Sequence, residues 1–226
     1  MKPSGIRAVI IDLDGTMLDT APDFQAAINC MRADMALGPL DIETIKEFVG
    51  KGSENLIRRV LAVDFDEAQV AQYFDAALSA YQRHYLAING DFATLYPQVR
   101  EGLDQLQRQQ LRLACVTNKP IAFTLPLLEK VGLRHYFDVI YGGDSLPTKK
   151  PDPGPFLQVC RDFDVAPAHV LAIGDSSNDA MAARAAGCHV LSVPYGYNHG
   201  EPVQAIDSDG IVDSLLDAAL LLATDF

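Results

Sequence analysis

Residues 8–16 read AVIIDLDGT, and no other part of the sequence says as much about its fold. Its first half is short, apolar and rich in β-branched residues, a pattern typical of a strand buried on both faces of a parallel sheet. Asp12 and Asp14 follow this strand two residues apart. Two carboxylates at the end of a buried strand cannot both be ordinary core residues, because a buried charge is costly unless it is paired or binds a metal. The stretch therefore predicts a parallel sheet with a polar site at the end of this strand.

Similar apolar runs recur along the chain, at residues 111–117, 139–141, 170–173 and 190–193. Helical patterns separate them, first through the apolar face of Val99, Leu103 and Leu106, and then at residues 121–131, 156–163 and 180–186. Alternating strands and helices predict an α/β fold with a mostly parallel sheet. Right-handed crossovers place the helices on both of its faces. We therefore predict a Rossmann-like core, a parallel sheet flanked by helices.

The segment after the first strand breaks this alternation. Pro22 suits the first turn of a helix, whose apolar face is formed by Phe24, Ala27, Ile28, Met31 and Met35. Three more stretches read as helices, at residues 42–49, 54–61 and 67–86, and none reads as a strand. We therefore predict a small all-helical cap domain at residues 20–92, inserted into a core formed by residues 1–19 and 93–226.

The composition excludes several classes of protein. The 226 residues carry a formal net charge of −12, with a sequence pI near 4.7, and such an acidic surface argues against binding to DNA, RNA or anionic membranes. No apolar run approaches the ~20 residues needed to span a bilayer. Residues 1–7 lead directly into the first strand, without the apolar segment of a signal peptide. We expect a cytoplasmic monomer or small homo-oligomer, with neither nucleic acid nor a membrane as partner.

The cysteines give no sign of a metal site. Cys30, Cys115, Cys160 and Cys188 show neither zinc-ligand spacing nor a C-x-x-C motif. Their spacing favours small buried hydrophobic residues in a reducing compartment.

Two further polar motifs follow predicted strands. Thr117 and Asn118 close the second strand, where a hydroxyl and nearby backbone N–H groups can hydrogen-bond phosphate oxygens. Lys150 precedes Pro151 in a conformationally restricted segment, and a lysine held in this way can act as a fixed positive charge on a phosphate. Because ligands bind at the carboxyl ends of parallel strands, these motifs are expected to converge with the first one.

A fourth motif adds carboxylates to this edge of the sheet. Asp175 follows the strand at residues 170–173, and Asp179 comes four residues later. Mg²⁺ prefers carboxylate oxygens and keeps several waters, so Asp12, Asp175 and the backbone carbonyl of Asp14 would form a suitable partial shell. Asp179 is expected either to ligate directly or to brace the site. Beside Mg²⁺, one of two paired carboxylates can attack phosphorus, and the other can move a proton to and from oxygen.

In this order and strand context, the four motifs resemble those of the haloacid dehalogenase superfamily of phosphohydrolases, over nearly the whole chain. The inserted helical block resembles the small helical cap of that superfamily. The resemblance implies Mg²⁺ as cofactor and an aspartyl-phosphate intermediate, with Asp12 as nucleophile, Asp14 as general acid/base and Asp175 as metal ligand. It also implies that Thr117 and Lys150 hold the phosphoryl group.

Within the superfamily the chain is most similar to bacterial phosphoglycolate phosphatases, through residues 19–23, 49–52, 117–120, 150–153, 174–176 and 195–200. This similarity implies 2-phosphoglycolate as the small anionic phosphate monoester that serves as substrate. Lys51 lies between two glycines of the predicted cap and is a candidate for binding the substrate carboxylate, and Asn118 is a further candidate substrate-binding residue. The sequence assigns no role to Tyr197 or His199.

Other functions share the same core and differ in the cap. A phosphatase for a sugar phosphate or an amino-sugar acid phosphate, and a phosphoglucomutase-like transferase, remain open. A haloacid dehalogenase works without Mg²⁺, so the presence of Asp14 and Asp175 argues against it. A phosphonoacetaldehyde hydrolase needs a Schiff-base lysine in the cap, for which Lys46 and Lys51 are formal candidates only. A noncatalytic binding protein has no need of the complete carboxylate set.

Overall fold

The short β-branched runs form the centre of the protein. In the computed structural model, which describes residues 5–223, they make a six-stranded sheet whose neighbouring strands are all parallel. The strand order is β5 (Val139–Tyr141), β4 (Arg112–Val116), β1 (Ala8–Ile11), β6 (Val170–Gly174), β7 (His189–Ser192) and β8 (Gly210–Ile211). Because β1 lies inside this order, all four of its residues are buried.

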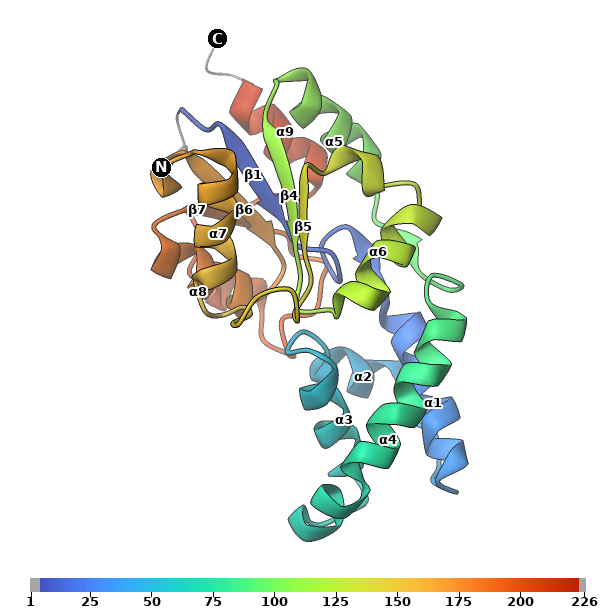
Figure 1. Cartoon of the computed structure of the whole chain (residues 1–226). Helices are drawn as coiled ribbons and strands as arrows, with labels where there is room; N and C mark the ends of the chain where they lie inside the picture. Colours follow the sequence, from blue (N-terminus) through green and yellow to red (C-terminus); the bar gives the residue numbers. More distant parts are fainter. Residues whose placement is uncertain (1–4, 224–226) are drawn as a thin grey trace.

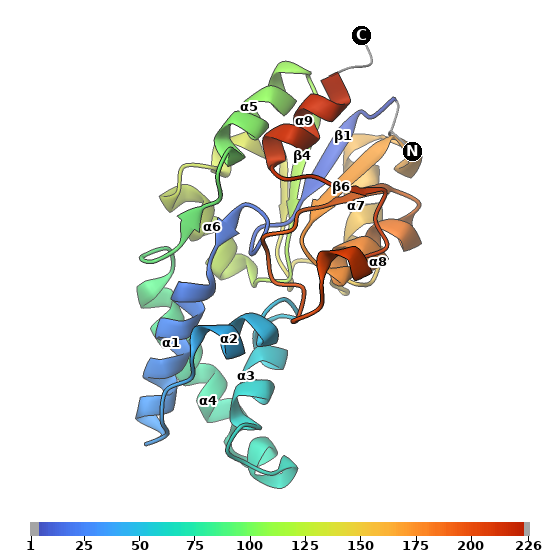
Figure 2. The same cartoon turned by 180° about the vertical axis from the view of Figure 1, so that it is seen from behind.

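Side chains alternate between the two faces of the sheet. Val9 and Ile11 pack on one face against α5 (Val99–Arg108), α6 (Ile121–Lys130) and α9 (Leu215–Ala223). Ala8 and Ile10 pack on the other face against α7 (Gly154–Phe163) and α8 (Ser177–Ala186). Figures 1 and 2 show these two helical layers with the sheet between them. The alternation explains why β1 is apolar throughout, since neither of its faces meets water.

Four helices form a separate body beyond the carboxyl ends of the strands (Figure 1). They are α1 (Ala21–Asp34), α2 (Ile42–Phe48), α3 (Ser53–Leu61) and α4 (Glu67–Ile88). Their apolar faces share one buried cluster, which includes Ile28, Met31 and Tyr81. A capping box begins α4: the Asp66 carboxylate accepts from the Gln69 backbone N–H at 2.9 Å, and the Gln69 side chain accepts from the Asp66 N–H at 3.1 Å.

Two chain segments connect these helices to the sheet. They pair as a short antiparallel ribbon of β2 (Leu18–Asp19) and β3 (Thr94–Leu95). The buried carboxylate of Asp23, in the first turn of α1, accepts from the N–H groups of Gly90 and Phe92 at 2.7 and 2.8 Å. The beginning of α1 is thereby tied to the segment that follows α4.

The predicted α/β class is confirmed, and all five predicted strands are present with ends shifted by up to two residues. Three strands and one helix were not predicted from the sequence. The strands β2, β3 and β8 have two residues each, too few to show any alternation. The helix α9 reads LLDAALLLA, which shows almost no polar face. Single 3₁₀ turns complete the described chain at Arg134–Tyr136, Pro167–His169 and Val203–Ala205.

Within residues 5–223, no helix is both long enough and apolar enough to cross a bilayer. The expectation about a signal peptide rests partly on residues 1–4, which lie outside the described residues.

Candidate active site

The register of the sheet brings the polar motifs to one edge. β1 pairs along its full length with residues 112–115 of β4 and residues 170–173 of β6, so these three strands end within one residue of one another. Asp12 directly follows β1, Thr117 directly follows β4, and Asp175 directly follows β6. This edge faces α1–α4 (Figure 1). Residues far apart in the sequence therefore meet between the sheet and the four helices.

Three carboxylates and one ammonium group form the centre of the site. Ligand oxygens of Asp12, Asp175 and Asp179 lie within 4.8 Å of one another. The buried Lys150 Nζ lies 2.8 Å from Asp12 Oδ1 and 2.7 Å from Asp179 Oδ1, and it also donates to the Val116 carbonyl at 2.8 Å. These three acceptors match the three protons of an ammonium group. Lys150 is thus held beside Asp12 with little freedom to move.

The charges of this cluster do not cancel. Burial raises the pKa of Asp12 well above its usual value although Lys150 opposes the shift. Burial and then the charge of Asp179 raise the pKa of Asp175 to about 7. For Lys150, burial disfavours the charged form, but Asp12 and Asp179 outweigh it and raise the pKa. Three carboxylates against one ammonium leave excess negative charge, and an all-oxygen donor set of this kind suits a hard divalent cation such as Mg²⁺.

The backbone comes unusually close to Asp175. A Cβ on Gly15, whose φ is +84°, would lie 2.3 Å from Asp175 Oδ2, and a Cβ on Gly196 would lie 2.3 Å from Asp175 Cβ. In the room that these glycines leave, Thr16 Oγ1 donates to Asp175 Oδ1 at 2.9 Å and the Tyr197 N–H donates to Oδ2 at 2.6 Å. The direction of the Asp175 carboxylate is therefore determined by its neighbours.

The Asp14 side chain lies apart from this cluster and points toward the helices. Its Oδ1 accepts from Thr20 Oγ1 at 2.7 Å and from Lys119 Nζ at 3.0 Å. Lys119 also donates to the Tyr85 hydroxyl of α4 at 2.6 Å, and its Nζ lies 4.3 Å from the centre of the Phe24 ring. A lysine of the sheet edge is thus buried between Asp14 and two aromatic residues of the helical body.

A loop between α2 and α3 rests directly on the sheet edge. The Gly50 carbonyl accepts from Asn118 Nδ2 at 2.9 Å and from Asn178 Nδ2 at 3.2 Å. Asn118 Nδ2 also donates to the Lys150 carbonyl at 2.9 Å. Gly50 and Gly52 have φ values of +109° and +86°, a backbone region in which glycine alone is free of strain. In this structure the helical body is closed over the site.

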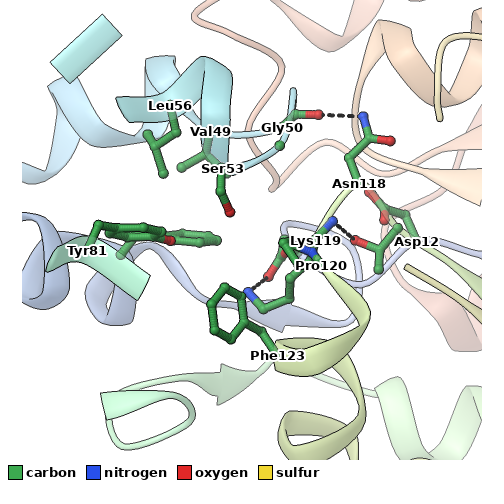
Figure 3. Close-up of a pocket in the computed structure, with 14 residues that line it drawn as sticks. Asp12, Val49, Gly50, Ser53, Leu56, Tyr81, Asn118, Lys119, Pro120 and Phe123 are labelled. Carbon is green, nitrogen blue, oxygen red and sulfur yellow. Dashed lines mark hydrogen bonds and ion pairs between the residues drawn. The ribbon is translucent and has the colours of Figure 1, made fainter. Parts of the chain in front are cut away.

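A small pocket remains between the two bodies (Figure 3). Its cavity is about 40 Å³, counted as the space that the centre of a water molecule can reach. Asp12, Asn118 and Lys119 line it from the sheet side, and Ser53 and Tyr81 line it from the helical side (Figure 3). Further lining residues are Asp14, Phe24, Val49, Gly50, Gly52, Leu56, Thr117, Pro120 and Phe123.

Most of the residues singled out from the sequence meet at this place. Asp12, Asp14, Thr117 and Asn118 line the pocket, and Lys150 contacts Asp12 and Asn118. A carboxylate oxygen of Asp175 lies within 4.8 Å of one of Asp12. Lys51 is exposed and is not among the pocket's lining residues.

Three polar lining residues received no role from the sequence: Lys119, Ser53 and Tyr81. Lys119 directly follows Thr117 and Asn118, so its place in that motif was a usable signal. Ser53 and Tyr81 carried none, since one begins a helix and the other continues the apolar face of a helix.

Comparisons with known proteins agree with this geometry. A family model described as haloacid dehalogenase-like hydrolase matches residues 9–193. A "Phosphoglycolate phosphatase" of Nitrosospira multiformis is 50% identical over 220 residues, which is 97% of each chain. Another of that name, from Thiobacillus denitrificans, is 46% identical over 224 residues, again 97% of each chain. A crystal structure described as a predicted phosphoglycolate phosphatase from Haemophilus somnus superimposes with a TM-score of 0.88 at 32% identity, covering 96% of this chain and 98% of that one.

Proposed function

The chain belongs to the haloacid dehalogenase-like hydrolases and is a phosphoric monoester hydrolase, and from this we propose that it hydrolyses 2-phosphoglycolate to glycolate and phosphate with Mg²⁺ as cofactor. The observation that carries the proposal is the closed pocket between Asp12 and Asp14 on one side and the cap helices on the other. The names of the two relatives described above support the choice of substrate.

In the proposed first step, a carboxylate oxygen of Asp12 forms a bond to phosphorus while the bond between phosphorus and the glycolate oxygen breaks. Lys150, 2.8 Å from Asp12 Oδ1, opposes the effect of burial on the pKa of this carboxyl group and attracts the phosphoryl oxygens. Asp179 holds Lys150 in place at 2.7 Å. The Thr117 hydroxyl, directly after β4, and the backbone N–H of Asn118 are the proposed hydrogen-bond donors to the phosphoryl group.

Asp14 is the proposed proton carrier. It donates a proton to the departing glycolate oxygen, and then takes one from the water that attacks the aspartyl-phosphate, so that phosphate leaves and Asp12 is regenerated. Thr20 and Lys119 orient its carboxylate. When bound among Asp12, Asp175 and the backbone carbonyl of Asp14, Mg²⁺ supplies positive charge that offsets the repulsion between the phosphoryl oxygens and the carboxylates.

The proposal is tested by phosphate release from a panel of monoesters, with Mg²⁺ and with EDTA. The panel contains 2-phosphoglycolate, sugar phosphates, an amino-sugar acid phosphate and a nucleoside monophosphate. We expect a kcat/KM for 2-phosphoglycolate at least about tenfold above the others, which corresponds to ~1.4 kcal/mol of selective transition-state stabilisation. We also expect EDTA to abolish release. A tenfold preference for another monoester would overturn the substrate, and release that persists undiminished in EDTA would overturn the metal requirement.

A further inference from the structure

Two hydroxyl groups of the cap face the catalytic carboxylates across the pocket. Tyr81 of α4 lines the pocket and is fully buried, and its hydroxyl has no hydrogen-bond partner among the described residues. Ser53, the first residue of α3, lies beside that hydroxyl without completing a hydrogen bond to it. A buried hydroxyl without a partner costs free energy, because it has lost its hydrogen bonds to water. A ligand that accepts a hydrogen bond from Tyr81 would remove this cost.

A cation lies on the opposite wall of the same pocket. The Lys119 side chain is 1% exposed, and its ammonium group has two acceptors within the described chain, Asp14 Oδ1 and the Tyr85 hydroxyl. An ammonium group has three protons, so one N–H is left for a further acceptor. The aromatic rings of Phe24 and Tyr85 lie 4.3 and 4.7 Å from Nζ and restrict its position.

We propose that Lys119, Tyr81 and Ser53 form a carboxylate-binding subsite that makes this enzyme selective for phosphate monoesters of short 2-hydroxy acids. The subsite rests on the proposed function and identifies the residues that recognise the substrate. It replaces Lys51 in that role, because Lys51 is exposed and lies outside the pocket's lining. One cation and two hydroxyl donors provide three hydrogen bonds to the two oxygens of a carboxylate.

The position of the subsite matches the chemistry of the substrate. Lys119 Nζ lies one hydrogen bond, 3.0 Å, from the carboxylate of Asp14, which protonates the leaving oxygen in the proposed mechanism. In an ester of a 2-hydroxy acid, the carboxylate carbon is two covalent bonds from that oxygen. A substrate whose leaving oxygen meets Asp14 therefore brings its carboxylate beside Lys119.

The Tyr81 hydroxyl is suited to donate rather than accept. Burial and then the charge of Asp14 raise the pKa of Tyr81 well above its usual value, so the phenol stays protonated. Leu56 and Phe123 add apolar surface to the wall of the same pocket. The subsite thus selects for negative charge.

Tyr81→Phe is the sharpest test, because it removes the hydroxyl, keeps the ring and touches no catalytic carboxylate. The matched control is Tyr73→Phe, on the same helix but packed against Phe65 rather than the pocket. The kcat/KM of each variant is measured with 2-phosphoglycolate and with 2-hydroxyethyl phosphate, in which a neutral hydroxymethyl group replaces the carboxylate. We expect Tyr81→Phe to lose about tenfold on 2-phosphoglycolate, mainly through KM, and less than about twofold on the neutral ester. Tyr73→Phe is expected to change neither.

Ser53→Ala and Lys119→Met complete the set. Ser53→Ala should lower the preference for 2-phosphoglycolate in the same direction as Tyr81→Phe. Lys119→Met should slow both substrates, since Lys119 also orients Asp14, but should cost more with the carboxylated one. Equal losses on both substrates in Tyr81→Phe and Lys119→Met would overturn the subsite while leaving the proposed function intact. A wild-type enzyme with no preference for 2-phosphoglycolate over the neutral ester would overturn both.

Discussion

At the scale of single residues, the site holds more negative charge than its own cations neutralise. Asp12, Asp175 and Asp179 converge on one ammonium group, that of Lys150. Such a cluster strains the protein in the absence of a bound cation, because like charges at low dielectric repel one another. The same excess of negative charge is what makes the cluster suited to hold a divalent cation.

Replacing the proposed nucleophile should remove activity without lowering thermal stability. Asp12→Asn is expected to lower kcat for 2-phosphoglycolate at least about a thousandfold, since the amide oxygen is a poor nucleophile. Its thermal midpoint without Mg²⁺ should equal or exceed that of the wild type, because Lys150 keeps Asp179 as partner and one repelling carboxylate is gone. Asp34→Asn, at an exposed ion pair on α1, is the control and should retain normal kcat. A loss of activity that is accompanied by a clear fall in the midpoint would contradict this account.

At the scale of elements, one aspartate connects the strands beyond β6 to a helix. Asp209, just before β8, accepts from the Val190 N–H of β7 at 2.9 Å and from Arg184 of α8 at 2.8 Å. Burial disfavours the charged form of Asp209, but the Val190 N–H and Arg184 outweigh it and hold the pKa below its usual value. One ionised side chain thus joins a helix and two strands.

The contribution of Asp209 to stability should depend on pH. A carboxyl group with a lowered pKa in the folded state stabilises the protein above its unfolded pKa of about 3.9, and loses this effect as the pH falls through the folded value. Asp209→Asn should therefore lower the free energy of unfolding by about 1 kcal/mol at pH 7, with a smaller difference from wild type below about pH 3.5. Chemical denaturation at both pH values measures this. Asp207→Asn, whose side chain is 84% exposed at 3.4 Å from Arg184, is the control. A difference that grows on acidification would contradict the assignment.

At the scale of the whole molecule, the four-helix body contacts the core at the edge of the sheet. The contact is made by the loop of Gly50, whose carbonyl accepts from Asn118 and Asn178. Tyr197 makes a second link, because its hydroxyl accepts from the N–H groups of Thr20 and Ala21 at 2.8 and 3.0 Å, where the cap begins. The backbone N–H of the same residue donates to Asp175. The closed cap and the proposed metal site are therefore joined through one residue.

Gly50→Ala should disturb this docking without unfolding either body. The φ of +109° is strained for alanine, and the added Cβ would lie 2.8 Å from the His199 ring. Strain of this kind costs on the order of 1–3 kcal/mol, so we expect kcat/KM for 2-phosphoglycolate to fall about tenfold or more. Gly38→Ala, between α1 and α2, has no atom within 4 Å of its new Cβ and should behave as wild type. Unchanged kinetics in Gly50→Ala would show that closure does not depend on this loop.

The sequence alone was enough to predict the α/β class and the main elements, because a strand buried on both faces leaves an unmistakable apolar run, as residues 8–11 do. It also identified the carboxylates and lysine that follow those strands, since parallel strands must bring their ends to one edge. It did not predict β2, β3 and β8, because each has only two residues, too few to show the alternation of a strand. It missed α9 because an almost wholly apolar segment shows no helical face.

The contacts between the cap and the core could not be predicted from the sequence, because they depend on how separate elements pack. Tyr81 belongs by its spacing to an apolar helix face, and nothing local distinguishes it from the core tyrosines of α4. Only the packing of α3 and α4 over the sheet edge leaves its hydroxyl in the pocket, opposite Lys119. Lys51 lies between two glycines of the loop whose Gly50 carbonyl accepts from Asn118, a contact of the backbone that the sequence does not show. Sequence periodicity records which face of an element is apolar, and it does not record which atoms of two separate elements come within hydrogen-bonding distance.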